Sequence, residues 1–281
     1  MKPVVFIPGF PASELHDSGG RVVFPPRPST LLHSAEKRAF LDAMLDIPGN
    51  LVAGPPIRSI LGIAKQAQSL YDILDRFSAP VTPIGWDWRL GVDDEAVMNA
   101  IAEAIDALAP RKVVMLVHST GALVLRAFLD AHPEAHDRID QVLAFGGAWC
   151  GTLEALYAVH HGRSESIFGV PLLSEDDGAN IVGHAQAAYD LFPLPDVQLV
   201  HDMRGNAVSP NVDLEWIKPG RDYARALAAR ADARLGSRHS DFGDLPLTNV
   251  AGWGGPTWPS AVLEPNDIYF LEPEKDAGDG T

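Results

Sequence analysis

One serine, Ser119, stands where an apolar strand-like run meets an apolar helix-like run with no loop between them. The segment over residues 113–128 reads VVMLVHSTGALVLRAF. A chain that passes from a strand to a helix within two or three residues makes a sharp turn, which exposes one side chain and directs the first helix amides toward negative charge. Ser119 is therefore a candidate nucleophile, and the amide of Thr120 is a candidate donor to the oxyanion of an attacked carbonyl.

This turn resembles the nucleophile elbow G-x-S-x-G, with one departure. Gly121 supplies the second glycine, which allows close approach to neighbouring segments, but Val117 stands in place of the first. The branched side chain of Val117 requires either a somewhat wider turn or a small residue on the neighbouring strand. Serine is also a good N-cap residue, so a buried helix with a serine cap explains the segment equally well.

A second oxyanion donor is expected from the loop that follows the first strand, where the sequence reads IPGFPAS over residues 7–13. Pro11 has no N–H and cannot serve. Phe10 is the natural candidate, and Gly9 gives the backbone the freedom to turn the Phe10 amide inward. The alternative is a loop rich in proline and glycine that takes no part in chemistry.

Strand patterns alternate with helix patterns along the chain, which predicts a mostly parallel sheet with helices on both faces, the α/β class. We expect strands at residues 4–8, 81–84, 113–118, 141–145 and 247–252, and helices near 35–45, 63–77, 94–109 and 222–235. The helix after Ser119 is apolar almost all round, so it should be central and buried. Two long segments interrupt the alternation, and we interpret them as insertions in a single domain over residues 1–281: a lid or loop at about 11–62 and a cap at about 151–221.

The composition restricts the possible partners. The formal net charge of −15 disfavours nucleic acid, and no run approaches the roughly 20 apolar residues of a transmembrane helix. The single cysteine, Cys150, excludes an internal disulfide and a thiolate metal site. The N-terminus lacks a signal-peptide pattern, so we expect a cytoplasmic protein. The oligomeric state is open.

Several other candidate residues have structural explanations. Asp87 and Arg89, within Trp-Asp-Trp-Arg at 86–89, are interpreted as an internal ion pair with aromatic packing. His160 and His161 should point apart on a helix, so we expect no metal and no cofactor. Trp149 and Cys150 follow the fourth strand and are expected to line a pocket, with Cys150 as a small apolar filler.

Seven pieces of the sequence, in order and with the right approximate spacing, resemble the lecithin:cholesterol acyltransferase family of α/β-hydrolases. They are PVVFIPGFPASEL, SLYDILDRF with GWDWRL, VHSTGALVLRAFL, AFGGAWCGTLEAL, YDLFPLP, NVAGWGGPT and GDGT. The resemblance implies the α/β-hydrolase fold, Ser119 as nucleophile, Phe10 and Thr120 as oxyanion donors, and Asp279 as the acid of the triad. By its composition alone, the end of the chain, EPEKDAGDGT, reads as a frayed acidic tail.

The triad histidine is the missing part of this pattern. In the α/β-hydrolase fold it follows the acid, and all ten histidines of this chain precede Asp279. His118 is interpreted as structural, and His239 lies in a polar loop. We expect the histidine and a final strand to lie beyond Thr281, in a longer protein of which this chain is a fragment.

The resulting hypothesis is serine-dependent acyl transfer on a lipid-like or other apolar ester, by a lipase, phospholipase or acyltransferase. Trp149, Phe168 and Leu172 are the candidate substrate contacts, although a buried cap core explains such apolar residues equally well. The alternative function is a catalytically silent α/β-hydrolase scaffold that acts as a binding module. Val117 and the absent histidine favour that alternative.

Overall fold

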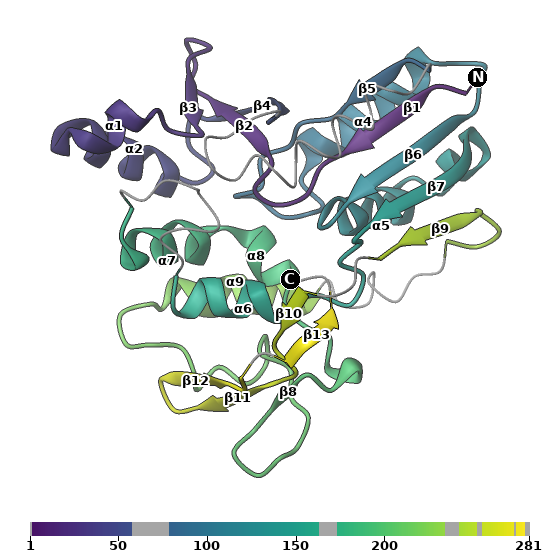
Figure 1. Ribbon diagram of the computed structural model, residues 1–281. Helices are drawn as coiled ribbons and strands as arrows, with labels where there is room; N and C mark the ends of the chain where they lie inside the picture. Colours follow the sequence, from purple (N-terminus) through teal and green to yellow (C-terminus); the bar gives the residue numbers. More distant parts are fainter. Residues whose placement is uncertain are drawn as a thin grey trace.

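Five parallel strands form the central sheet, in the order β5-β1-β6-β7-β9 (Figure 1). The structure, a computed structural model, describes residues 2–57, 79–162, 173–233, 242–251, 255–272 and 274–278. The strands are β1 (Val4–Ile7), β5 (Val81–Pro83), β6 (Val113–His118), β7 (Ile139–Phe145) and β9 (Leu247–Val250). Each lies where the sequence predicts a strand, and the predicted α/β fold with a mostly parallel sheet is confirmed.

The sheet is buried through both of its faces, as the continuous apolar strand sequences indicate. Val5, Ile7 and Met115 belong to one large core with α4 (Glu95–Ala107) and α5 (Gly121–Ala131). Val4 and Leu116, whose side chains alternate with those, lie in a second, smaller buried cluster. The outer strand β9 differs, because all four of its residues are exposed.

The two helices that pack on the sheet follow from the sequence pattern. The carboxylate of Asp94 caps α4 by accepting a hydrogen bond from the Ala96 amide at 3.1 Å. Helix α5 is central and buried as expected, and it is followed by the short helix η1 (Pro133–Arg138). The helix predicted near 63–77 lies outside the described residues.

The first long segment, between β1 and β5, builds a small layer of its own (Figure 1, upper left). Its described residues contain a three-stranded antiparallel sheet in the order β3-β2-β4 and two helices. Their bounds are β2 (Ser13–His16), β3 (Val22–Phe24), α1 (Pro28–Leu32), α2 (Ser34–Leu45) and β4 (Val52–Pro56). The sequence predicted α2 but none of these strands.

The second long segment and the end of the chain form the lower part of the molecule in Figure 1. Here lie α6 (Leu153–His160), α7 (Glu175–His184), α8 (Gln186–Asp190), η2 (Pro195–Val197), β8 (Val200–His201) and α9 (Tyr223–Ala233). They are joined by β10 (Gly255–Thr257), β11 (Ala261–Glu264), β12 (Asp267–Phe270) and β13 (Glu274–Gly278). Because β13 pairs with β10, the interpretation of residues 274–278 as a frayed tail is wrong.

None of the helices in the described residues combines the length and the apolar character needed to cross a bilayer.

Candidate active site

Ser119 occupies the turn between β6 and α5 with a positive φ of 50°. Residues other than glycine rarely adopt this left-handed conformation, and where they do, the surrounding structure holds them there. The end of β7 supplies that restraint: the Ser119 amide donates to the Phe145 carbonyl at 3.1 Å, and the Ala148 amide donates to the Ser119 carbonyl at 3.2 Å. The turn therefore has the backbone strain of a nucleophile elbow, not the geometry of an ordinary N-cap serine.

The departure at Val117 is accommodated by a small neighbour. Val117 is fully buried and pairs in register with Ile7 on β1 and with Ala144 on β7. Ala144 thus provides the small residue that the sequence required. Gly121 is needed for close approach, because a Cβ atom there would lie 2.4 Å from the carbonyl oxygen of Ile7.

The loop after β1 lies directly beside the serine. A Cβ atom added to Gly9 would lie 2.7 Å from Ser119 Cβ and 3.2 Å from Ser119 Oγ. The next amide, that of Phe10, donates to Thr120 Oγ1 at 3.3 Å, a long hydrogen bond that a stronger acceptor could replace. The Thr120 amide has no acceptor among the described residues. Both candidate oxyanion donors therefore belong to segments in contact with Ser119.

A cavity of about 250 Å³ opens at Ser119. Its walls come from the carboxyl ends of neighbouring parallel strands, where α/β proteins place their ligands, and from α6 and β10. The lining residues are Ser119, Gly146, Gly147, Ala148, Gly151, Thr152, Leu153, Leu199, Asn249, Val250, Ala251, Thr257 and Trp258. Ser119 is half-buried, so its side chain is accessible from this cavity and not enclosed in hydrocarbon.

Replacement of Gly9 by alanine tests this close approach. The added methyl group must displace either the loop or Ser119, and a displacement of about 1 Å at a reacting centre can cost about 10²-fold in rate. We expect turnover of an ester substrate to fall by about 10²-fold, with a smaller change in KM. The control is Gly19→Ala in an exposed turn, where the nearest contact is a carboxylate oxygen 3.3 Å away. Equal turnover in both variants would contradict the arrangement.

A buried aromatic and ionic block anchors the loop that carries Gly9 and Phe10. The Trp86 indole donates to the Pro8 carbonyl at 3.1 Å, and the Trp88 indole donates to the Ser13 carbonyl at 3.3 Å. The ring of Phe10 packs edge-on against Trp88, with the centroids 5.1 Å apart. This block fixes the loop on both sides of the Phe10 amide.

Asp87 and Arg89 form the ionic part of that block, as the sequence suggested. Arg89 is fully buried and donates to both carboxylate oxygens of Asp87, at 3.0 and 2.7 Å. It also donates to the carbonyl oxygens of Ala43 at 3.1 Å and Asp46 at 3.3 Å, which ties the block to the first long segment. Neither residue lines the Ser119 cavity, so the role of this ion pair is to hold the surrounding segments in place.

The same block reaches the second long segment. The Arg89 carbonyl accepts from the Gln186 amide at 2.8 Å, and the buried carboxylate of Asp190 accepts from the Val92 amide at 3.1 Å. The YDLFPLP piece of the sequence, which contains Asp190, therefore connects the lower part of the molecule to the segment after β5.

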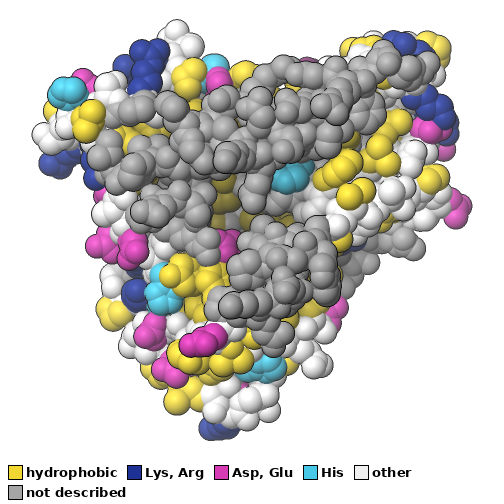
Figure 2. Space-filling model, viewed as in Figure 1, with side chains coloured by type: hydrophobic (Ala, Val, Ile, Leu, Met, Phe, Trp, Pro, Cys, Tyr) yellow, Lys and Arg dark blue, Asp and Glu magenta, His cyan; other side chains and the backbone are white. Residues whose placement is uncertain are grey.

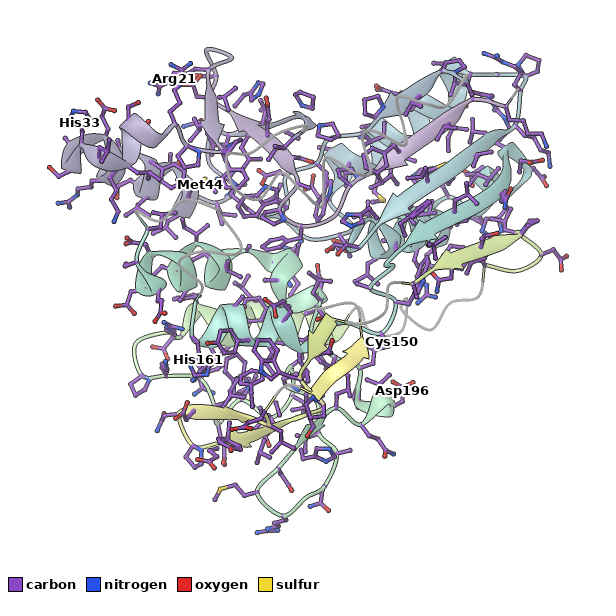
Figure 3. The ribbon with its side chains drawn as sticks, viewed as in Figure 1. Arg21, His33, Met44, Cys150, His161 and Asp196 are labelled. Atoms are coloured by element: carbon purple, nitrogen blue, oxygen red, sulfur yellow. The ribbon has the colours of Figure 1, made fainter. Side chains whose placement is uncertain are left out.

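The other predicted site residues have mixed outcomes. Trp149 is not among the cavity-lining residues. Its indole donates to Oδ1 of Asn249, a lining residue, at 3.2 Å, so Trp149 contacts the cavity wall without lining the cavity. Cys150 is exposed, and its description as an apolar filler is wrong; Figure 3 labels its position at the junction of the upper and lower parts. Phe168, Leu172, His239 and Asp279 lie outside the described residues.

The expectation that His160 and His161 point apart is wrong. Helix α6 ends at His160, so His161 is the C-cap and not the next residue of a regular helix. The two ring centroids are 4.5 Å apart, and one ring nitrogen of each lies within 4.8 Å of the other and of a carboxylate oxygen of Asp267. A signal in the sequence was Gly162, whose φ of 78° follows the helix end.

The buried His160 makes the lower part of the molecule sensitive to acid. Its Nε2 is hydrogen-bonded to Asp267 at 2.9 Å, and its Nδ1 has no partner among the described residues. Burial lowers the pKa of His160 from 6.5 to about 4. The unfolded chain therefore binds more protons than the folded chain between these values, so the free energy of unfolding falls as the pH drops from 6.5 to about 4.

We expect this loss to reach at most about 3 kcal/mol, since each pKa unit corresponds to about 1.4 kcal/mol. Urea unfolding at several pH values between about 7 and about 4.5 measures it. The variant His160→Gln has no imidazole to protonate, so its free energy of unfolding should depend less on pH over this range. A wild-type protein and variant with the same pH dependence would rule out His160 as the source.

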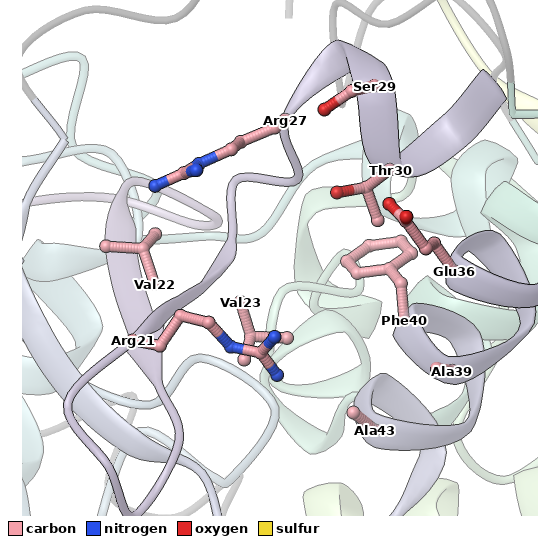
Figure 4. Close-up of a pocket in the computed structure, with 10 residues that line it drawn as sticks. All are labelled: Arg21, Val22, Val23, Arg27, Ser29, Thr30, Glu36, Ala39, Phe40 and Ala43. Carbon is pink, nitrogen blue, oxygen red and sulfur yellow. The ribbon is translucent and has the colours of Figure 1, made fainter. Parts of the chain in front are cut away.

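A second cavity, of about 400 Å³, lies in the first long segment (Figure 4). It lies between β3 and the helices α1 and α2, and Phe40, Val22 and Val23 supply apolar parts of its wall. Arg21 and Arg27 are also among its lining residues. It shares no lining residue with the Ser119 cavity, so the two cavities are separate.

The parallel strand order, the strand-to-helix turn at Ser119 and the cavity at the carboxyl ends of the strands are those of the α/β-hydrolase fold. The lecithin:cholesterol acyltransferase family matches residues 64–226, which is more than half of the chain. The chain belongs to the lecithin:cholesterol acyltransferase family. This membership supports acyl transfer or hydrolysis on lipid esters as the class of activity.

One solved structure supports this fold, and two others show weaker similarity to the chain. A chain of the Tle4–Tli4 complex superimposes with a TM-score of 0.54 at 14% identity, over 99% of this chain and 85% of that chain. A Bacillus licheniformis lipase, BlEst2, gives 0.39 at 14% identity, over 89% of this chain and 65% of that one. The haloalkane dehalogenase DatA from Agrobacterium tumefaciens C58 gives 0.31 at 13% identity, over 90% and 72%. The curated proteins contain no match to the chain.

Proposed function

We propose that the protein transfers acyl groups from lipid-like esters through a covalent intermediate on Ser119. The observation that carries the proposal is the positive φ of Ser119, on a turn that opens into a cavity. Strain of this kind is retained at sites where it positions a reacting group. A buried helix cap has no need of it.

In the proposed reaction Ser119 Oγ attacks the ester carbonyl and gives its proton to a general base. The C–O bond to the alcohol then breaks, and the alcohol leaves with that proton. The amides of Phe10 and Thr120 stabilise the negative oxygen of the tetrahedral intermediate. Water or a second alcohol takes the acyl group in the reverse sequence of steps, which gives hydrolysis or transfer.

The acid and the base are the parts that the proposal takes from the family resemblance. The resemblance implies Asp279 as the acid, followed by a histidine as the base. In the described part of the chain, no histidine is hydrogen-bonded to Ser119. The described strand β13 ends at Gly278, which pairs with Gly255 of β10.

The direct test is labelling with a fluorophosphonate, which reacts with activated serines, on the full-length product of the gene. We expect one label per chain, on the peptide that contains Ser119, and competition by esters of long-chain fatty acids. Assays with phospholipid vesicles, with and without an added alcohol, separate hydrolysis from transfer. Absence of labelling would favour the silent scaffold instead.

A further inference from the structure

We propose that His160, His161 and Asp267 form a binding site for a divalent transition-metal ion, Zn²⁺ in the first place. The site joins the end of α6 to the start of β12, two elements more than 100 residues apart in sequence. It does not depend on the proposed chemistry at Ser119.

The geometry of the three groups suits such an ion. Their ligand atoms all lie within 4.8 Å of one another, and His160 Nε2 is 2.9 Å from Asp267 Oδ1. Two atoms that bind one ion at about 2.1 Å in tetrahedral geometry lie about 3.4 Å apart. Small side-chain movements would therefore let an ion replace the hydrogen bond between His160 and Asp267.

The chemistry of the donor set favours zinc over calcium or magnesium. Two imidazoles and one carboxylate are typical zinc ligands, whereas the alkaline-earth ions prefer oxygen alone. Burial lowers the pKa of both histidines, so the rings are neutral near pH 7, the form that binds metal. The pKa of Asp267 is also lowered, chiefly by a hydrogen bond from the Ile268 amide, so its carboxylate is ionised.

The site is open to solvent on the side of Asp267 and packed against the protein on the side of His160. His160 is buried and packs against Trp216, with ring centroids 6.0 Å apart, while the Asp267 side chain is 63% exposed. Water could therefore complete the coordination on the outer side. Two cations lie nearby, because Lys218 and Arg221 each donate to the His160 carbonyl at 3.2 Å. Figure 3 labels His161 in the lower part of the molecule, and Figure 2 shows acidic, histidine and hydrophobic side chains close together over that part.

A bound ion would stabilise one wall of the Ser119 cavity. His161 packs on Tyr157 with centroids 4.8 Å apart, and Tyr157 stacks on Trp258 at 4.7 Å and 17°. Trp258 lines the cavity. The metal site would therefore lie two aromatic rings behind the cavity and fix the helix end that carries Tyr157.

The test is Zn²⁺ binding by equilibrium dialysis, with the metal content measured by mass spectrometry, on wild-type protein first stripped with EDTA. We expect one Zn²⁺ per chain. The variants His161→Ala and Asp267→Asn should bind it at least about 10-fold more weakly. The matched control is His132→Ala, which removes another histidine paired with a carboxylate, Glu134 at 3.3 Å, but without a second imidazole; it should bind Zn²⁺ as wild type does.

A thermal-melting experiment separates a metal site from a purely structural hydrogen bond. His161→Ala leaves the contact between His160 and Asp267 intact, so the variant should fold, as circular dichroism would verify. Zn²⁺ should raise the Tm of wild-type protein and EDTA should reverse the rise, because an ion that binds the folded state stabilises it. In His161→Ala the rise should be absent. Zinc uptake that is undetectable in wild type, or equal in wild type and His161→Ala, would overturn the proposal.

Discussion

Replacement of Ser119 by alanine is expected to lower the turnover of ester substrates by about 10³-fold or more. Loss of the nucleophile in a serine hydrolase removes the covalent route and leaves only the contribution of the oxyanion donors and of binding. The backbone should be unaffected, since alanine replaces serine at the same position with the loss of one oxygen. Hydrolysis of a chromogenic fatty-acid ester by the full-length protein measures the change, and fluorophosphonate labelling should disappear with it.

The control for this variant is Cys150→Ala. Cys150 is an exposed thiol next to Gly151 of the cavity wall, and a thiol can also act as a nucleophile. Its loss should leave turnover and labelling within about twofold of wild type, since it removes no part of the route through Ser119. Retention of activity in Ser119→Ala together with loss in Cys150→Ala would reverse the assignment of the nucleophile.

Replacement of Arg89 by alanine is expected to reduce the free energy of unfolding by about 3–5 kcal/mol, the usual cost of removing one partner of a buried ion pair. The substitution leaves the Asp87 carboxylate, 8% exposed, without its cation. The carbonyl oxygens of Ala43 and Asp46 lose a donor as well. Urea unfolding followed by circular dichroism measures the effect, because the midpoint falls in proportion at constant slope.

The matched control is Arg21→Ala, which removes an arginine whose side chain is 78% exposed and paired with Asp17. Exposed pairs of this kind contribute at most about 1 kcal/mol. The variant Arg89→Lys keeps the charge but loses the two-pronged contact with Asp87, so it should be intermediate. Equal stability of Arg89→Ala and Arg21→Ala would mean that the block does not hold the segments together.

The central sheet and the sharp turn at Ser119 could be predicted because their signals are local. Each of the five strands lies in a short β-rich run, and the step from strand to helix at Ser119 is visible within ten residues. The internal pair of Asp87 and Arg89 was also predicted, since only Trp88 separates the two residues in the sequence. In each case the residues that interact, or that form the pattern, are close to one another in the sequence.

What the sequence did not predict depends on pairing between distant residues. The strand β13 exists through its pairing with β10, and its own composition resembles a tail. The contact of His160 with Asp267 spans 107 positions, and the convergence of His160 with His161 depends on where the helix ends. One approach between distant residues was expected: Gly9 and Ser119 are 110 positions apart, and the strand-to-helix turn predicted that the loop after the first strand lies beside the serine.

The left-handed backbone conformation of Ser119 affects both the stability of the fold and the chemistry available at this turn. A non-glycine residue in this conformation costs on the order of 1–3 kcal/mol, which the contacts of the surrounding strands must offset. A chain selected only for stability would have glycine at position 119, because glycine adopts this conformation with less strain. That chain would have no hydroxyl group at this turn. Under the proposed function, the serine therefore marks a point at which the fold gives up resistance to heat or denaturant in exchange for reactivity.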